Sequence, residues 1–180
     1  ANHGVLTFNG TTDLTDSMVN VGALDVKAAT TLTDSLLNVA SETTLNASLT
    51  LTGTNQPSLG NTLGTIVGGS GTLRLNNAQV TASGWTATDA SLAMDNGTLF
   101  LNDARLVTLQ GLTMSNGSVL NAKAGLTVTD VVETLQGSSI TAGGDLTFSN
   151  GLKDASASTL KATGDIVVTD TSLKGSALNL

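Results

Sequence analysis

The chain has 180 residues, a formal net charge of −7 and a sequence pI near 4.3, and so lacks the basic face that nucleic acids and anionic membranes require. Apolar residues make up 39% of it, which is enough for a core and excludes a disordered chain, whereas aromatic residues make up only 2%. The abundance of Thr, Val, Asn, Ser and Gly favours strands and turns over helices, and the absence of cysteine excludes disulfides.

The N-terminus shows no targeting signal. Ala1 to Gly4 has neither the basic start nor the apolar stretch of a secretion signal, and no apolar run approaches the length of a membrane span. We therefore interpret the chain as a mature form, an internal fragment or a cytosolic protein, without membrane insertion. The single histidine, His3, lacks partner ligands, and we interpret it as a solvated terminal residue.

The first part of the chain repeats with a period of roughly 18 residues. Residues 14–21 match residues 32–39, and residues 22–26 follow residues 4–8 in the same register. Within each repeat, apolar residues alternate with Thr, Ser, Asn or Asp, which is the period of a strand with one buried face. Residues 53–64 fit no repeat and contain the only proline, Pro57, so we predict an inserted loop there.

From residue 91 onward the repeat lengthens to 20 residues, because 91–100 matches 111–120 without a gap. This register predicts that Met94 stacks on Met114 in the core. It also predicts columns of similar side chains on successive coils: Leu106, Leu126, Leu146 and Ile166; Thr108, Val128, Phe148 and Val168; Leu92, Leu112, Val132 and Leu152; Val80, Phe100, Leu120, Ile140 and Leu160; and a small-residue column of Ala82, Ala122, Ala142 and Ala162, interrupted by Asn102.

Three short strand segments per repeat, separated by corner residues, fit one turn of a three-sided coil. We predict an all-β fold: a single right-handed parallel β-helix over residues 1–180, with about nine coils of about 20 residues. Strands stacked at roughly 4.8 Å would make a rod of about 40–45 Å. We find no amphipathic helix to cap an end, so we expect a piece of a longer solenoid or a unit that stacks on copies of itself.

Few residues offer chemistry. Asp145 and Asp165, 20 residues apart, are expected to stack on adjacent coils, where they would bind calcium, act as a carboxylate pair or accept turn hydrogen bonds. We favour the turn interpretation, since neither Arg74 nor Arg105 falls in such a cluster. Trp85 either stacks on a sugar or fills a wide corner of the core. We therefore predict no catalytic, cofactor-binding or metal site, and no cofactor.

Thr-x-Thr pairs suggest a further alternative. They occur at 31/33, 50/52, 86/88 and 127/129, and flat ladders of such pairs allow some β-solenoids to bind ice. The 20-residue register places Val107 and Leu109 beside Thr127 and Thr129, which interrupts the ladder and disfavours ice binding.

The last third of the chain has a recognisable repeat. Residues 138–148 (Ser-Ser-Ile-Thr-Ala-Gly-Gly-Asp-Leu-Thr-Phe) and 158–168 (Ser-Thr-Leu-Lys-Ala-Thr-Gly-Asp-Ile-Val-Val) resemble the repeat of filamentous haemagglutinin-type exoproteins, and residues 119–128 form a looser copy. Autotransporter passenger domains are similar too. The resemblance implies a Gram-negative surface fibre exported by a two-partner or autotransporter route. The Asn-Pro-rich motif of the export domain is absent, which indicates shaft rather than export domain.

Together these observations predict a secreted, extracellular shaft segment of a bacterial surface adhesin, and not an enzyme. The expected partner is a host or bacterial surface receptor, either a protein or a glycan, contacted through the outward Thr, Asn and Ser faces or the loop at 53–64. The alternatives are a self-assembling extracellular filament subunit that associates end to end, a polysaccharide-binding or polysaccharide-cleaving β-helix, and ice binding.

Overall fold

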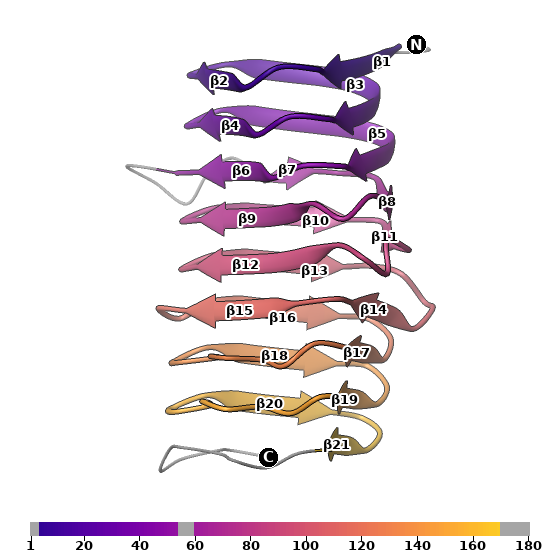
Figure 1. Cartoon of the computed structure of the whole chain (residues 1–180), viewed down its shortest axis with the longest axis vertical. Helices are drawn as coiled ribbons and strands as arrows, with labels where there is room; N and C mark the ends of the chain where they lie inside the picture. Colours follow the sequence, from indigo (N-terminus) through magenta and orange to yellow (C-terminus); the bar gives the residue numbers. More distant parts are fainter. Residues whose placement is uncertain (1–3, 54–59, 170–180) are drawn as a thin grey trace.

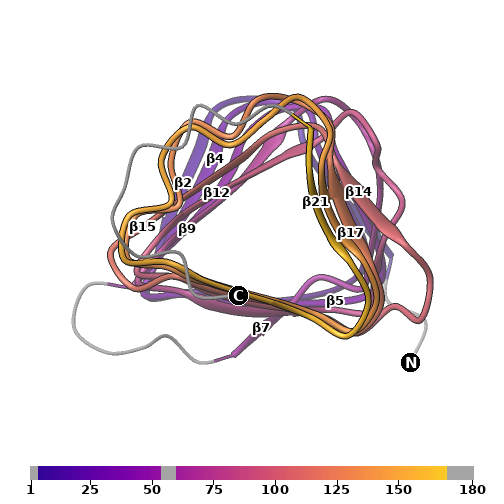
Figure 2. The same cartoon turned by 90° about the horizontal axis from the view of Figure 1, so that it is seen from below.

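The computed structural model describes residues 4–53 and 60–169, in which all regular structure is β (Figure 1). It confirms the predicted parallel β-helix. About eight turns stack at a spacing of roughly 19 residues, close to the predicted nine coils of about 20. Viewed from the C-terminal end, the chain runs counter-clockwise as it approaches the viewer, so the solenoid is right-handed, as predicted (Figure 2).

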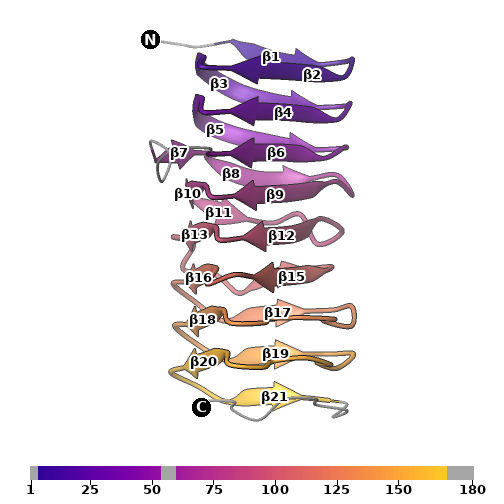
Figure 3. The same ribbon diagram turned by 90° about the vertical axis from the view of Figure 1, so that its left-hand side faces the viewer.

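Each coil has three sides around one core, and the strands of each side pair in parallel with their equivalents on the neighbouring coils (Figures 2 and 3). The six-stranded sheet contains β2 (Thr12–Thr15), β4 (Thr30–Thr33), β6 (Leu49–Thr52), β9 (Thr72–Asn76), β12 (Ser91–Asp95) and β15 (Leu112–Ser115). The four-stranded sheet contains β14 (Val107–Leu109), β17 (Leu126–Val128), β19 (Leu146–Phe148) and β21 (Ile166–Val168).

The eleven-stranded sheet covers the remaining side and, in the N-terminal coils, continues around a corner onto the side that the four-stranded sheet occupies later. Its members are β1 (Val5–Phe8), β3 (Met18–Val26), β5 (Leu36–Leu45), β7 (Asn61–Thr62), β8 (Thr65–Gly68), β10 (Gln79–Ala82), β11 (Gly84–Trp85), β13 (Thr98–Leu101), β16 (Val119–Ala122), β18 (Ser139–Ala142) and β20 (Thr159–Ala162).

The alternation of apolar and polar residues builds the core. Val80, Leu99, Leu120, Ile140 and Leu160 occupy paired positions on five successive coils, and each is 0% exposed. The residues between them point outward and are mainly Thr, Asn and Ser. Every buried side-chain N or O atom of the described residues has a hydrogen-bond partner, so the core has no unsatisfied polar side chains.

The corner after the six-stranded sheet requires a left-handed backbone. After five of its six strands the corner residue has φ between 48° and 55° and is Asp or Asn, which tolerate this conformation better than other residues with a Cβ: Asp16, Asp34, Asn77, Asn96 and Asn116. Small residues follow inside the corner. The Ser35 hydroxyl accepts from the Ser17 N–H at 3.0 Å, and the Ser118 hydroxyl accepts from the Gly97 N–H at 3.2 Å, so these serines link neighbouring coils.

The predicted columns are wrong by one residue in a single coil. Leu99, not Phe100, pairs with Val80 and Leu120, and Leu101 takes the place assigned to Asn102. Likewise Val107 and Leu109 pair with Leu126 and Val128, in place of Leu106 and Thr108. The cause is a change in coil length, because the interval from Val80 to Leu99 is shorter than the interval from Leu99 to Leu120. Since side chains alternate between faces, a one-residue slip moves Phe100 and Leu106 outward.

The predicted loop at 53–64 is only partly a loop. Residues 54–59 lie outside the described residues. Asn61 and Thr62 form β7, the Asn61 Oδ1 accepts a buried hydrogen bond from the Leu37 N–H at 2.8 Å, and Leu63 is 0% exposed. Leu49 pairs with Thr30 on one side and with Leu73 on the other, and the second interval is the longer, so this coil does contain extra residues. Its last part nevertheless belongs to the stacked core.

Candidate functional site

The stacked carboxylates Asp145 and Asp165 lie at an exposed corner before β19 and β21. The Asp145 Oδ1 accepts a hydrogen bond from the Asp165 N–H at 2.9 Å, and the Asp165 carbonyl accepts one from the Leu146 N–H at 2.9 Å. The Asp145 side chain therefore serves as a turn acceptor between coils, which is the interpretation favoured from the sequence. Within 4–53 and 60–169, no three His, Asp or Glu side chains are grouped closely enough to hold a metal ion. His3 lies outside the described residues.

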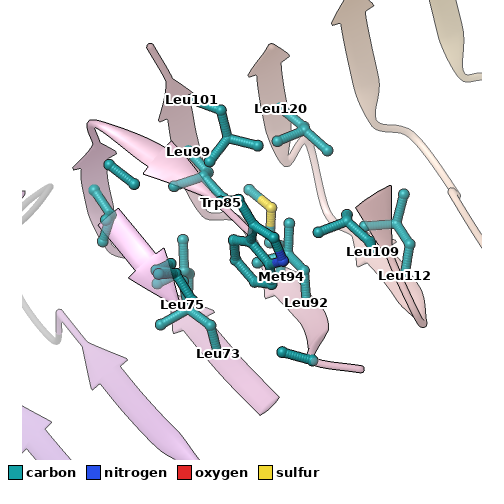
Figure 4. Close-up of a cluster of buried hydrophobic side chains, with 14 of the residues drawn as sticks. Leu73, Leu75, Trp85, Leu92, Met94, Leu99, Leu101, Leu109, Leu112 and Leu120 are labelled. Atoms are coloured by element: carbon teal, nitrogen blue, oxygen red, sulfur yellow. The ribbon is translucent and has the colours of Figure 1, made fainter. Parts of the chain in front are cut away.

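Trp85 is buried and cannot stack on a sugar. It is 1% exposed, its indole N–H donates to the Ala87 carbonyl at 2.8 Å, and it lies among leucines and Met94 inside the coil (Figure 4). Met94 pairs with Met114, as the sequence predicts, and both are buried. Of the two alternatives for Trp85, the structure therefore supports the wide core corner.

An ion pair that the sequence did not predict lies where two sheets meet. Arg105 donates two hydrogen bonds to Asp103 from one edge of its guanidinium, from Nε to Oδ1 at 3.0 Å and from Nη2 to Oδ2 at 2.8 Å. The Asp103 Oδ1 also accepts from the Arg105 backbone N–H at 3.0 Å. These hydrogen bonds, above all those from the side chain of Arg105, hold the pKa of Asp103 below its ordinary value.

The position of this pair indicates a structural role. β11 pairs with β8 and β14 pairs with β17, so β11 and β14 belong to separate sheets on the same side of the coil. Asp103 is 8% exposed, and a Cβ added to Gly84 would lie 2.6 Å from its Oδ2. The carboxylate therefore packs against the β11 backbone and is not free to act on a ligand. Arg105 lies only two residues after Asp103, so their contact is local and could not be predicted from the 20-residue repeat.

The outer face of the six-stranded sheet carries two regular rows of side chains. The first row is Asp13, Thr31, Thr50, Arg74, Ala93 and Thr113, and the second is Thr15, Thr33, Thr52, Asn76, Asp95 and Ser115. Thr31/Thr33 and Thr50/Thr52 therefore do form a short ladder, which ends at Arg74.

The neighbour predicted for Thr127 on the preceding coil, Val107, is wrong, whereas Thr147 on the following coil is confirmed. Thr127 pairs with Thr108 and with Thr147 on the four-stranded sheet, because of the same one-residue slip. The row then reaches Val167, which pairs with Thr147. A threonine row thus runs through three coils here. Each of these strands is three residues long and contributes only one threonine, so the row does not form a flat Thr-x-Thr ladder.

Two shallow depressions of about 250 Å³ each open on the outer faces. One lies on the eleven-stranded sheet beside a polar ladder, in which the Asn38 side-chain amide donates to the Asn20 Oδ1 at 2.9 Å and the Thr62 hydroxyl donates to the Asn38 Oδ1 at 3.3 Å. The other lies on the six-stranded sheet, over Ala93 and next to Arg74. The second depression, whose lining includes Arg74, Ser91 and Thr113, suits the hydrogen-bonding edge of a polar ligand better than an apolar one.

The described residues contain no helix that is long and apolar enough to cross a membrane. In comparisons with known proteins, no family model matches the chain, and no curated protein and no solved structure is significantly similar to it.

Proposed function

We propose that the chain is a structural and adhesive shaft segment of a secreted bacterial surface exoprotein, with a role that is not enzymatic. The observation that carries this proposal is the continuous buried column from Val80 to Leu160, surrounded by outward Thr, Asn and Ser. Such a core makes the rod stiff. The strands of every coil pair with those of the next coil, so bending the rod would disturb the hydrogen bonds of several sheets at once.

A shaft acts through its length. Each coil adds roughly 4.8 Å, so the length of a solenoid scales with the number of repeats and does not depend on a closed globular core. A longer array would hold a distal binding or toxic activity away from the cell. The resemblance of residues 138–148 and 158–168 to haemagglutinin-type repeats supports export to the bacterial surface, and the absence of cysteine suits a chain that is exported unfolded. The receptor would be a protein or a glycan.

Immunolabelling of the producing bacterium tests this proposal. Antibodies against the purified chain should label intact cells or extracellular fibres, and a strain that lacks the chain should attach less well to its target surface. Labelling that appears only after the cells are permeabilised would contradict the proposed location. Small-angle X-ray scattering of a tandem duplicate should show a rod about twice as long as that of the single chain; an unchanged maximum dimension would contradict the shaft.

One observation favours a second function, that of a self-assembling filament subunit. β1 and β2 are the end strands of their sheets, and Val5 and Met18 in this first coil are 70% and 68% exposed. Open strand edges with apolar neighbours favour pairing with another chain. Light scattering and negative-stain microscopy over a wide concentration range distinguish the two functions: fibres that grow with concentration support a filament, and a monomer at all concentrations supports a shaft segment.

A further inference from the structure

The depression on the six-stranded sheet results from a local loss of side-chain volume. The outward positions at its centre are Ser91 and Ala93 on β12, and Gly111 lies next to Ser91 on the following coil. The flanking strand β9 carries the larger Thr72 and Arg74 at the paired positions. A step in side-chain height therefore forms one wall of a shallow groove on an otherwise flat face.

Arg74 is the distinctive group of this groove. The chain has two arginines, and the other, Arg105, is held by Asp103 through two hydrogen bonds from its Nε and Nη2. The ion pairs of the described residues are Lys27–Asp25, Arg105–Asp103 and Lys153–Glu133, so Arg74 takes part in none of them. An exposed guanidinium without a carboxylate partner offers a planar pair of donors that matches one carboxylate.

The opposite end of the groove has the opposite charge. Asp130 lines it there, three coils beyond Arg74, which at roughly 4.8 Å per coil is about 14 Å along the axis. The hydroxyls of Ser91 and Thr113 lie between the two charges. The groove therefore presents a guanidinium that can donate hydrogen bonds to a carboxylate, hydroxyl groups in its middle, and a carboxylate that can accept hydrogen bonds at its other end.

We propose that this groove binds an oligosaccharide that carries a single carboxylate, with the acid on Arg74 and sugar hydroxyls on Ser91, Thr113 and Asp130. This inference rests on the proposed adhesive role and specifies its ligand class. The charge balance excludes a dense polyanion, because the groove pairs one cation with one carboxylate in a chain of net charge −7. A neutral sugar would leave the guanidinium without its partner.

Binding can be measured by NMR titration of the isotope-labelled chain with sialyllactose as the acidic probe and lactose as its neutral match. Shift changes should cluster on β9, β12 and β15, and lactose should bind at least tenfold more weakly. Arg74→Gln should weaken sialyllactose binding at least tenfold, and Arg74→Lys should have an intermediate effect because it keeps the charge and loses the fork. Ala93→Leu should fill the groove and abolish binding without changing the circular dichroism spectrum.

The matched control is Lys161→Gln, which removes one exposed charge from the outer face of β20, a different side of the coil, and should leave binding unchanged. The proposal would be overturned if Arg74→Gln and Lys161→Gln weakened binding equally, or if a heparin fragment bound more tightly than sialyllactose. Either result would show that binding is a non-specific attraction between charges. The absence of shifts at saturating probe, or Arg74-dependent binding of an acidic peptide without glycan binding, would also overturn the proposal. Scattering on the same sample reports the rod independently, so loss of the glycan site and loss of the shaft are separable results.

Discussion

The N-terminal and C-terminal coils solve the same corner in two ways. In the N-terminal coils, β3 and β5 are 9 and 10 residues long and run continuously around the corner, with a register shift between Val21 and Ala23. In the C-terminal coils the corresponding path is divided into two short strands, for example β18 and β19, joined by the turn Gly143-Gly144-Asp145. The corner is thus a bent strand at one end of the solenoid and a separate turn at the other.

The difference accounts for the two repeat lengths. The interval from Leu14 to its partner Leu32 is shorter by two residues than the interval from Leu126 to its partner Leu146. The additional residues of the longer repeat are available for the separate turn. The inward-facing residue before the corner also changes: Val21 pairs with Val39 in the N-terminal coils, and Ala122 pairs with Ala142 in the C-terminal coils. A smaller side chain fits where the chain turns more sharply.

The largest expected effect tests whether the two regions unfold together. Leu24→Ala and Leu146→Ala each remove a side chain that is at most 1% exposed, from the same side of the coil in the two regions. Each should lower the free energy of unfolding by about 2–5 kcal/mol. Urea unfolding can be followed by the fluorescence of the single tryptophan, Trp85, and by circular dichroism.

If the coils form one cooperative unit, both variants shift a single transition that the two signals report at the same urea concentration. A second transition in only one variant would show that the two kinds of corner divide the rod into separate folding units, as nearest-neighbour coupling in repeat proteins allows.

The next effect tests the separate turn. In Gly143→Ala the new Cβ would lie 2.0 Å from the Lys123 carbonyl oxygen, a backbone atom that cannot rotate away. We expect a loss of about 2–3 kcal/mol in the free energy of unfolding, measured by urea denaturation. The bent-strand corner has Ala40 and Ser41 at the equivalent turn, both exposed, so a Cβ is tolerated there.

Gly68→Ala is the matched control for Gly143→Ala. Gly68 ends β8 in the N-terminal half, and nothing lies within 4 Å of its added Cβ, so the change should be within about 0.5 kcal/mol. Equal effects of the two substitutions would mean that the close approach at Gly143 relaxes without penalty.

A smaller effect concerns the junction between β11 and β14. Since the pKa of Asp103 is lowered in the folded chain from an ordinary value of 3.8, the Asp103–Arg105 pair stabilises the fold above that pH. The stabilisation is lost as the pH falls through the lowered pKa, below 3.8. The side chain of Arg105 is 69% exposed, so solvent screening limits the contribution to about 1 kcal/mol.

The pH dependence isolates this pair. Urea unfolding at pH 7 and near pH 2 should show that the wild type loses about 1 kcal/mol more than Asp103→Asn over this range. Asp89→Asn, which removes an exposed carboxylate from the same part of the chain, should behave as the wild type does. A pH response of Asp103→Asn equal to that of the wild type would show that the pair does not hold the junction.

Sequence periodicity was sufficient to predict the parallel β-helix and the Met94–Met114 pair, because alternation and repeat length determine both. It failed at Leu99-Phe100-Leu101 and Leu106-Val107, where adjacent apolar residues fit either face. If the repeat length is assumed constant, it assigns the wrong one of two adjacent residues to the core, because the interval from Val80 to Leu99 is one residue shorter than the assumed 20. The loop boundary at 61–64 was wrong for a related reason: the buried amide of Asn61 replaces an apolar core residue and hides the alternation.

The groove beside Arg74 was not predicted, because it depends on the absence of side-chain volume at Ala93 and Gly111 on adjacent coils. The sequence distinguishes such residues from ordinary corner residues only when the register is known. The Asp103–Arg105 contact was missed because it joins residues within one turn, outside the repeat.

The smallest expected effect tests the corrected register directly. Phe100 is half-buried on the outer face of β13, between the inward Leu99 and Leu101, which are at most 1% exposed. Phe100→Thr should change the free energy of unfolding by no more than about 0.5–1 kcal/mol, since threonine fits an outward strand position next to Thr81 and Asn121. The constant 20-residue register predicts the reverse, a core residue whose loss costs about 3–5 kcal/mol. Leu99→Thr is the matched variant and should be the more damaging of the two, because it places a hydroxyl in an apolar column. If Phe100→Thr proved more damaging, the 20-residue repeat would extend unbroken through this coil, and Thr108 would no longer pair with Thr127 in the outward row of the four-stranded sheet.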